Sequence, residues 1–292
     1  MFGGAEGQAG EGASYIPRSG QAIGGNMQWA KRWLTAVRTA GAASIRGHAV
    51  THLYCLCWNE VHMLPYFFRH YDPLVDRYFI FDDGSTDGSL DLLRQHPRVT
   101  LRSFKSENDS FVESARLFYD TAWRESCGRA DWVMLVNIDE HLHHPEGSTY
   151  FRRCRRKGYT ILPAKGYEMV SDQFPKGDTP LYATVKTGIR TAQLDKLCAF
   201  NPDAITHIGY GPGRHTSAPQ GRVVTPERAK LKLLHYKYLG ASYVTERYAQ
   251  LRERMLAGDR AQRRGWHYFQ DAETIASNHR NMLASASPVR GL

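Results

Sequence analysis

The segment Asp131-Trp-Val-Met-Leu-Val-Asn-Ile138 is the most apolar part of the chain, and polar residues follow it directly. A short apolar run of this kind predicts a strand that is buried on both faces in the middle of a parallel sheet. Segments with helical spacing separate it from three earlier strand-like runs, which we expect at 49–57, 77–81 and 99–104. Regular alternation of strands and helices predicts an α/β fold with a doubly wound, mostly parallel sheet.

The composition excludes several classes of protein. The 292 residues are 42% hydrophobic, enough to bury a large core, which excludes disordered and fibrous chains. We find no apolar run of about 18 residues that could span a membrane, and 1–25 lacks the pattern of a secretion signal. Five scattered cysteines favour a reducing, cytoplasmic location. The net charge of +9 (38 basic minus 29 acidic residues) predicts attraction to nucleic acid, an anionic membrane or a phosphorylated ligand.

The chain divides into four regions by composition and spacing. We expect a disordered Gly-rich leader at 1–26, a basic amphipathic helix at 27–45, a main domain at 46–240 and a helical extension at 241–292. The region 166–221 is rich in Gly, Pro and Thr and predicts added β structure and loops. For the segment 27–40 we keep three alternatives: it packs on the protein's own surface, it lies on a membrane, or it contacts a partner.

Acidic side chains follow two of the predicted strands. Asp82 and Asp83 come after the second strand, and Asp139 and Glu140 after the fourth. We expect the two strands to be neighbours, so that both clusters lie on one rim of the sheet. Close carboxylates repel unless a cation lies between them, and Mg²⁺ or Mn²⁺ commonly binds one or two carboxylates plus ligand phosphates. The rim therefore predicts a metal and a diphosphate; the alternative is a pair of solvated turns.

Four groups of residues resemble a known family. They are Cys57-Trp58-Asn59-Glu60, Phe81-Asp82-Asp83-Gly84-Ser85-Thr86-Asp87-Gly88-Ser89, Leu135-Val136-Asn137-Ile138-Asp139-Glu140-His141-Leu142 and Leu234-His235-Tyr236. Together they resemble glycosyltransferase family 2-like proteins, in the branch where an Asn-Glu pair opens the domain and a His-Tyr strand closes it. The resemblance covers residues 51–238.

The resemblance implies a GT-A-type domain that binds a nucleotide sugar, with a uridine diphosphate (UDP) sugar as donor, Mn²⁺ or Mg²⁺ as cofactor and inversion at the anomeric carbon. It implies that Asp82 and Asp83 hold the base, since a carboxylate accepts from the uracil imide N–H. Asn137 stands where the family usually has an Asp near the ribose, so Asp139 must bear the metal, with Glu140 beside it. The expected donor-binding residues are Trp58, Asn59, Glu60, Asp82, Asp83, Asn137, Arg116 and Lys196.

Late histidines are candidates to complete the metal site. His235 lies in the closing strand and His215 in a Gly-Pro-Gly-Arg-His loop; neutral imidazole can bind Mn²⁺, and the alternative is a structural histidine. The cluster His141, His143 and His144 could bind zinc, but we expect it to be a rim loop, because no further ligands accompany it at a convincing spacing.

Inverting transfer also needs a base that takes the proton of the acceptor hydroxyl. The available carboxylates after the fourth strand are Glu168, Asp172, Asp178 and Asp195. We favour Asp172 and keep Glu168 as its alternative. We expect the acceptor to be a carbohydrate or a lipid-linked molecule, and no motif in the sequence distinguishes the two.

Two competing functions fit less well. Nucleotidyltransferases usually carry a Gly-rich basic loop after the first strand, whereas this chain has Trp58-Asn59-Glu60-Val61. A membrane-surface or nucleic-acid binder with an inactive nucleotide-binding fold would use the basic excess. Because the predicted ligand edge is acidic, we expect the excess Lys and Arg to reflect a location on the inner face of a membrane or solubility, and expect no nucleic-acid partner.

Overall fold

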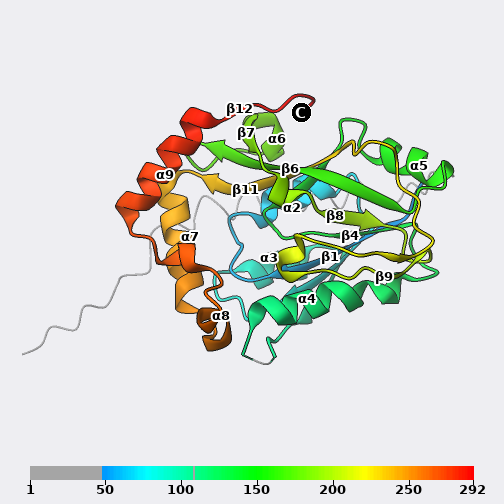
Figure 1. Cartoon of the computed structure of the whole chain (residues 1–292), viewed down its shortest axis with the longest axis horizontal. Coiled ribbons are helices and arrows are strands. Elements are labelled where there is room, and N and C mark those ends of the chain that lie inside the picture. The colour runs from blue at the N-terminus through cyan, green and yellow to red at the C-terminus, as the bar shows by residue number, and fades with distance from the viewer. Residues whose placement is uncertain (1–47, 108) are drawn as a thin grey trace, which may run out of the picture.

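The computed structural model describes residues 48–107 and 109–292 (Figure 1). The leader predicted at 1–26 and the amphipathic helix predicted at 27–45 lie outside the described residues, so the membrane contact through 27–40 stays a prediction. Within the described ranges, no helix is long and apolar enough to cross a membrane.

The first half of the chain forms a parallel sheet, as predicted. Its strands lie in the order β3-β2-β1-β4, and every pair is parallel. The strands are β1 (Thr51–Cys57), β2 (Arg77–Asp82), β3 (Val99–Ser103) and β4 (Trp132–Leu135). The connecting helices are α2 (Leu64–Tyr71), α3 (Ser89–Gln95) and α4 (Phe111–Thr121), with a 3-10 turn η1 (Ala122–Ser126) after α4. The predicted α/β fold class is confirmed, but β1 separates β2 from β4, so the two acidic clusters follow strands that are not neighbours.

Helices cover both faces of the parallel sheet. Along β1, Leu53 and Cys55 belong to the core cluster that contains α2, whereas Tyr54 belongs to the cluster that contains α4. Successive residues of a strand point to opposite faces, so a strand that is apolar at every position is buried on both. Ser110 and Glu113 have the spacing of a capping box at the start of α4, and half of it forms: the hydroxyl of Ser110 accepts a hydrogen bond from the backbone N–H of Glu113.

The second half of the chain extends the same sheet with mixed strand directions. The antiparallel continuation from β4 runs through β8 (Leu197–Phe200), β6 (Ile161–Ser171), β7 (Thr187–Arg190) and β12 (Ser287–Pro288). The long strand β11 (Leu231–Leu239) pairs with β6 in parallel and with β5 (Glu140–His143) antiparallel. Its register sets His235 opposite Glu140 on one side and opposite Glu168 on the other. The remaining elements are α5 (Ser148–Arg156), α6 (Leu181–Thr184), η2 (Ala192–Leu194), η3 (Pro212–Arg214) and the pair β9 (Ile205–His207) and β10 (Gln220–Gly221).

The C-terminal helices stand at one end of the sheet, at the left of Figure 1. They are α7 (Ala241–Glu253), α8 (Ala257–Ala261), the 3-10 turn η4 (Trp266–Phe269) and α9 (Ala272–Ser285). Asp259 of α8 joins them to α4, because its carboxylate accepts hydrogen bonds from the backbone N–H of Phe111 (2.8 Å) and the hydroxyl of Ser110 (2.6 Å). The start of α4 is therefore capped by a residue far away in the chain.

The histidine cluster after the fourth strand is not a rim loop, and this expectation was wrong. His141 and His143 lie in β5 and are buried. The ring of His141 stacks on that of His70 from α2, with centroids 4.7 Å apart. Nothing in the described ranges groups three or more His, Cys, Asp or Glu side chains so that they could hold a metal ion.

Candidate active site

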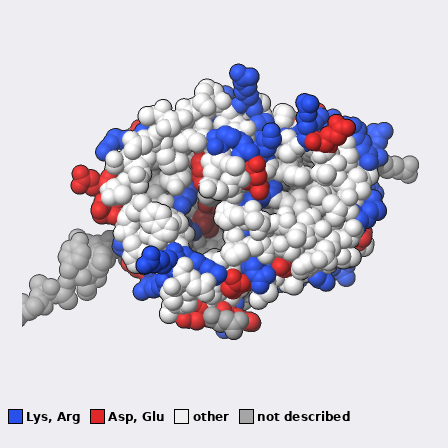
Figure 2. Space-filling model, viewed as in Figure 1, with Lys and Arg blue, Asp and Glu red and all other residues white. Residues whose placement is uncertain are grey.

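A cavity of about 500 Å³ opens where β1, β2 and β4 end. It is the hollow near the middle of the molecule in Figure 2. One wall comes from the loops after these strands and from β11, and the opposite wall comes from α4, α7 and the segment 254–268. Ligands of open α/β sheets bind at the carboxyl ends of the strands. The cavity therefore lies where the sequence predicts the ligand site.

His235 joins two carboxylates at the floor of this cavity. Its Nε2 atom lies 3.1 Å from Oδ2 of Asp139, and its Nδ1 atom lies 2.9 Å from Oε2 of Glu168. Burial alone would lower the pKa of His235, but the two carboxylates outweigh it and raise the pKa to about 10. Burial opposes ionisation of Asp139 as well, and His235 still holds the pKa of Asp139 below its ordinary value. Without a ligand, the three residues form a chain of charged hydrogen bonds.

The same arrangement fits a divalent cation with two protein ligands. Two ligands at right angles on Mg²⁺ or Mn²⁺, each at about 2.1 Å, stand about 3 Å apart, which matches the separation of Asp139 Oδ2 from His235 Nε2. A hydrogen bond from the other ring nitrogen to a carboxylate is typical of a metal-bound histidine, and Glu168 supplies it. His215 lines the cavity but is exposed, and its Nδ1 bonds to the carbonyl of Gln193 at 2.8 Å. The predicted metal residues Asp139 and His235 thus come together, and no contact joins His215 to them.

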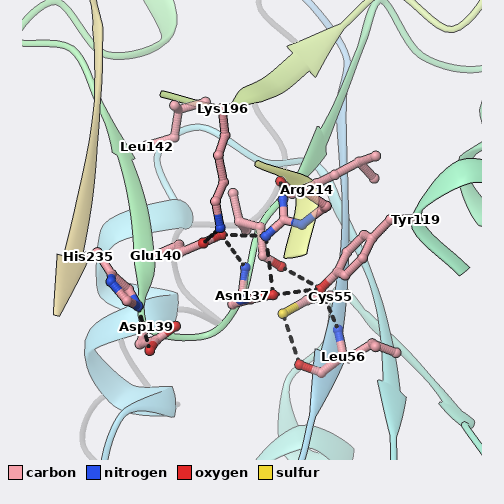
Figure 3. A network of polar contacts seen from close by, with 12 residues as sticks. Cys55, Leu56, Tyr119, Asn137, Asp139, Glu140, Leu142, Lys196, Arg214 and His235 are labelled. Atoms are coloured by element: carbon pink, nitrogen blue, oxygen red, sulfur yellow. Dashed lines mark hydrogen bonds and ion pairs between the residues drawn. The ribbon is translucent and has the colours of Figure 1, made fainter. Parts of the chain in front are cut away.

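Glu140 turns away from Asp139 and pairs with two buried cations (Figure 3). One carboxylate oxygen lies 2.6 Å from Nζ of Lys196, and the other contacts the guanidinium of Arg214. Burial opposes ionisation, but Arg214 and Lys196 hold the pKa of Glu140 well below its ordinary value. The structure therefore does not support Glu140 as a neighbour of the metal. Lys196 lines the cavity as expected, but its charge is already paired.

The side chain of Asn137 is held by two donors. Its side-chain oxygen accepts hydrogen bonds from Tyr119 (3.0 Å) and Arg214 (3.2 Å). Arg214 also donates to the carbonyl of Leu135, and its guanidinium lies 4.3 Å from the centre of the Tyr119 ring. Arg214 is the buried centre of this network, although the sequence pattern drew attention to the adjacent His215.

Trp58 lies under two arginines from the C-terminal region. The guanidinium of Arg254 is 4.1 Å and that of Arg247 is 5.3 Å from the centre of its ring. Arg247 also donates to the carbonyls of Trp58 and Asn59 and contacts Glu60, while Arg254 contacts Asp83. Burial raises the pKa of Glu60 to about 8, although Arg247 opposes this shift.

The predicted acidic edge is present at the strand ends, where the charged lining residues of the described chain are Glu60, Asp83, Asp139 and Glu140, but basic residues from other elements balance it across the cavity. Among the described residues, seven basic side chains and six acidic ones line the cavity. The basic residues are Arg116, Lys196, Arg214, Lys237, Arg247, Arg254 and Arg264. Four of them follow residue 236, so the C-terminal part of the chain supplies much of the positive charge of the cavity. Lys237 is half-buried; its side chain meets Nε2 of His267 at 3.1 Å and forms no ion pair with a carboxylate of the described chain.

Two predicted donor residues hold a loop and do not line the cavity. The carboxylate of Asp82 accepts hydrogen bonds from the backbone N–H groups of Gly84 and Ser85 and from the Ser85 hydroxyl. The side chain of Asn59 accepts from the backbone N–H of Thr86 at 2.7 Å. The Asp82 contacts form a local turn, whereas the Asn59 contact ties the loop after β1 to the loop after β2. By contrast, Trp58, Glu60, Asp83, Asn137 and Arg116 line the cavity.

The structure also separates the two candidate bases. Asp172 is exposed beyond the end of β6 and does not line the cavity. Glu168 lines it from within β6, and one of its oxygens bonds to His235. Asp172 therefore lacks the position that the sequence interpretation required. Arg116 reaches the cavity but is engaged with Glu113 (2.8 Å) and Asp120 (3.4 Å).

Comparison with known proteins finds a relative by sequence. No family model matches the chain. A glycosyltransferase family 92 protein of rice (Oryza sativa subsp. japonica) is 26% identical over 208 residues, which cover 64% of this chain and 33% of that protein. The chain thus spans about a third of the length of this relative.

Two solved structures are distantly similar to this chain. Residues 1–349 of S. aureus TarS align with 81% of this chain and 72% of that one, at 9% identity and a TM-score of 0.37. 4-diphosphocytidyl-2C-methyl-D-erythritol synthase aligns with 53% of this chain and 77% of that one, at 12% identity and a TM-score of 0.31. At these TM-scores neither likeness bears on function.

Proposed function

We propose that this protein is a metal-dependent glycosyltransferase that moves a sugar from a UDP-sugar donor to a hydroxyl acceptor with inversion. The observation that carries the proposal is the pairing of Asp139 with His235 at the floor of a cavity at the strand ends. The similarity to a rice glycosyltransferase family 92 protein supports the activity class.

Asp139 and His235 would hold Mn²⁺ or Mg²⁺ through a carboxylate oxygen and Nε2. When bound, such an ion neutralises charge that develops on the leaving diphosphate. Glu168 fixes the imidazole with Nε2 facing Asp139, because it accepts the hydrogen bond from the opposite ring nitrogen. Lys237, which lacks a carboxylate partner in the described structure, offers a further positive charge to the diphosphate.

The wall around Trp58 is our candidate for the nucleoside. An aromatic ring can stack on a base, and the carboxylate of Asp83 can accept the imide N–H that distinguishes uracil from cytosine. Asp83 already contacts Arg254, so the arginine holds the carboxylate in place at the cavity wall. We assign Asp82 and Asn59 to loop support and not to the donor.

Glu168 is the better candidate for the base. One of its oxygens bonds to His235, and no other contact occupies its second oxygen among the described residues. That oxygen can take the proton of an acceptor hydroxyl as the hydroxyl attacks the anomeric carbon. The prediction of Asp172 as base is replaced, because an exposed carboxylate outside the cavity cannot reach a hydroxyl inside it.

A nucleotide-binding experiment tests the proposal. Thermal unfolding is followed with uridine, guanosine and thymidine diphosphates, each with and without Mn²⁺, on the wild type and on Asp139→Ala. We expect UDP with Mn²⁺ to raise the midpoint in the wild type and to have little effect on the variant. If no nucleotide stabilises the wild type, with or without Mn²⁺, the proposal fails. If Asp139→Ala responds like the wild type, the metal assignment fails.

Measuring the rate of sugar transfer decides whether Glu168 or Asp172 is the base. With the UDP-sugar that binds, Glu168→Gln should abolish transfer, whereas Asp172→Asn should keep it near the wild-type rate. The opposite result would restore Asp172 as the base.

A further inference from the structure

A second cavity, of about 520 Å³, adjoins the first beside the C-terminal helices. It lies between β7, the end of β11, α7, η4 and α9. Lys237, Val244, Tyr248 and His267 line both cavities, so the two share one wall. The two cavities therefore lie side by side, one layer of side chains apart.

The lining of this second cavity combines aromatic rings with carboxamides. The aromatic residues are Tyr238, Tyr248 and Trp266, and the carboxamides are Gln270, Asn278 and Asn281. The Asn278 and Asn281 side chains are exposed, and no hydrogen bond ties any of the three carboxamides to the described chain. They are free to donate to and accept from a ligand. No Asp or Glu from the described residues lines the cavity, and Lys237 on the shared wall is its one lysine or arginine there.

Local structure places the two asparagine side chains on one face of a helix. Asn278, Asn281 and Ser285 follow one another at helical spacing along α9, so they line one side of it. The helix is anchored at its start by the side chain of Asp271, which accepts from the N–H of Thr274, and midway by His279, which bonds to the carbonyl of Ser171.

Trp266 is held outward by the turn that precedes it. Gly265 has φ of +67°, and a Cβ at this position would approach a ring atom of Tyr268 to 2.7 Å. Only glycine fits such a turn without strain. The Trp266 side chain emerges with 66% of its surface exposed, at the mouth of the second cavity. A tryptophan this exposed leaves a large apolar face available to a ligand.

We propose that the second cavity binds the sugar units of a neutral oligosaccharide acceptor next to its reactive end. Aromatic rings pack against the C–H faces of sugar rings, and carboxamides pair with hydroxyls in both directions. A polyanion would need more positive charge than Lys237 alone supplies. An acyl chain would leave the polar carboxamides facing apolar groups without hydrogen-bond partners. The inference rests on the proposed function, because it takes the first cavity as the site of transfer.

Ligand-observed saturation-transfer NMR on the full chain tests the inference. The probes are cellotetraose, maltotetraose, β-1,4-galactotetraose and β-1,4-mannotetraose, and UDP with Mn²⁺ is measured in parallel. We expect at least one tetrasaccharide to bind. Trp266→Ala should weaken that binding about tenfold, as for loss of a central aromatic contact, and the double variant Asn278→Ala with Asn281→Ala should weaken it as well. Both should leave UDP binding unchanged.

Phe269→Ala is the matched control. Phe269 is on the same turn and is 52% exposed, but it does not line the second cavity. Its removal should leave tetrasaccharide binding unchanged. If anionic lipid vesicles bind the wild type, both Trp266→Ala and Phe269→Ala weaken that binding, and no tetrasaccharide binds, the aromatic turn is a membrane contact and the inference is overturned.

The remaining outcomes separate the two proposals. If UDP with Mn²⁺ binds and no tetrasaccharide does, the inference fails while the proposed function stands. If a tetrasaccharide binds in a Trp266-dependent way and no nucleotide does, the proposed function fails while the carbohydrate site remains. Tetrasaccharide binding that Trp266→Ala and the double variant leave unaltered also overturns the inference.

Discussion

The imidazole of His235 meets the carboxylate of Asp139 at 3.1 Å, although 96 positions separate the two residues in sequence. The contact exists because β11 pairs with β5 directly after the loop that carries Asp139. The partner strand β6 supplies Glu168 on the other side of the ring. Strand pairing therefore builds the site from three segments that are far apart in the sequence.

Removing Glu168 should weaken metal binding without abolishing it. We expect Glu168→Gln to lower the affinity for Mn²⁺ in the presence of UDP by about 10 to 100-fold, because the ring loses the carboxylate that orients it. His235→Ala should lose nearly all Mn²⁺ dependence. Isothermal titration calorimetry measures both. Glu227→Gln, at an exposed glutamate outside the cavity, is the control. Equal Mn²⁺ affinity in Glu168→Gln and the wild type would contradict the role of Glu168.

Arg254 should contribute to nucleotide affinity. Arg254→Ala removes a guanidinium that lies over Trp58 and contacts Asp83, and we expect the dissociation constant for UDP to rise about tenfold, or about 1.4 kcal/mol. Arg252→Ala is the control, because Arg252 is nearby in the chain but does not line the cavity. Titration calorimetry with UDP and Mn²⁺ compares the two. Equal losses in both variants would indicate a general charge effect and not a local contact.

Glu140 should be more important for stability than for ligand binding. Glu140→Gln leaves Lys196 and Arg214 buried without their shared carboxylate, which should lower the free energy of unfolding by about 3–5 kcal/mol. The more exposed pair of Glu125 and Arg102 provides the comparison: Glu125→Gln should cost less than about 1 kcal/mol. Urea unfolding at neutral pH measures both. A small loss in Glu140→Gln would show that the buried cations find other partners.

Buried histidines should make the protein sensitive to acid. Burial lowers the pKa of His70 from 6.5 to about 4, against the opposing hydrogen bond to the Leu142 carbonyl. Between these two values the unfolded chain binds the proton and the folded chain does not. Stability is therefore complete above pH 6.5 and falls as the pH drops toward 4, and His70 alone should account for about 2 kcal/mol between pH 7 and pH 5.

Urea unfolding at pH 7 and pH 5 checks this dependence. His70→Gln should reduce the difference between the two pH values, whereas His62→Gln, at an exposed histidine, should leave it as in the wild type. An unchanged difference in His70→Gln would mean that other groups, such as His143, whose pKa burial also lowers to about 4, dominate the acid response.

The local pattern was enough to predict the parallel half of the sheet. Apolar runs and helical spacing identified β1 to β4 and the helices between them, because burial on both faces of a parallel strand leaves a continuous apolar run. The closing strand expected at Leu234-His235-Tyr236 is also observed, as part of β11. The part that failed was the interpretation of polar residues: Asp82 and Asn59 resemble ligand residues in sequence, but Asp82 forms a turn and Asn59 ties two loops together.

The sequence by itself determined the fold class and the edge of the sheet at which a ligand can bind, since both follow from periodicities within a few residues. Only the tertiary structure decided the composition of the site. Arg247 of α7 and Arg254, the residue directly after α7, reach Trp58 from at least 189 positions later in the chain. Arg214, one residue before the candidate His215, takes the buried place beside Glu140. No local pattern marks such residues, because an arginine on a solvated helix face and one facing a cavity have the same sequence neighbours. Their positions depend on how distant strands and helices pack.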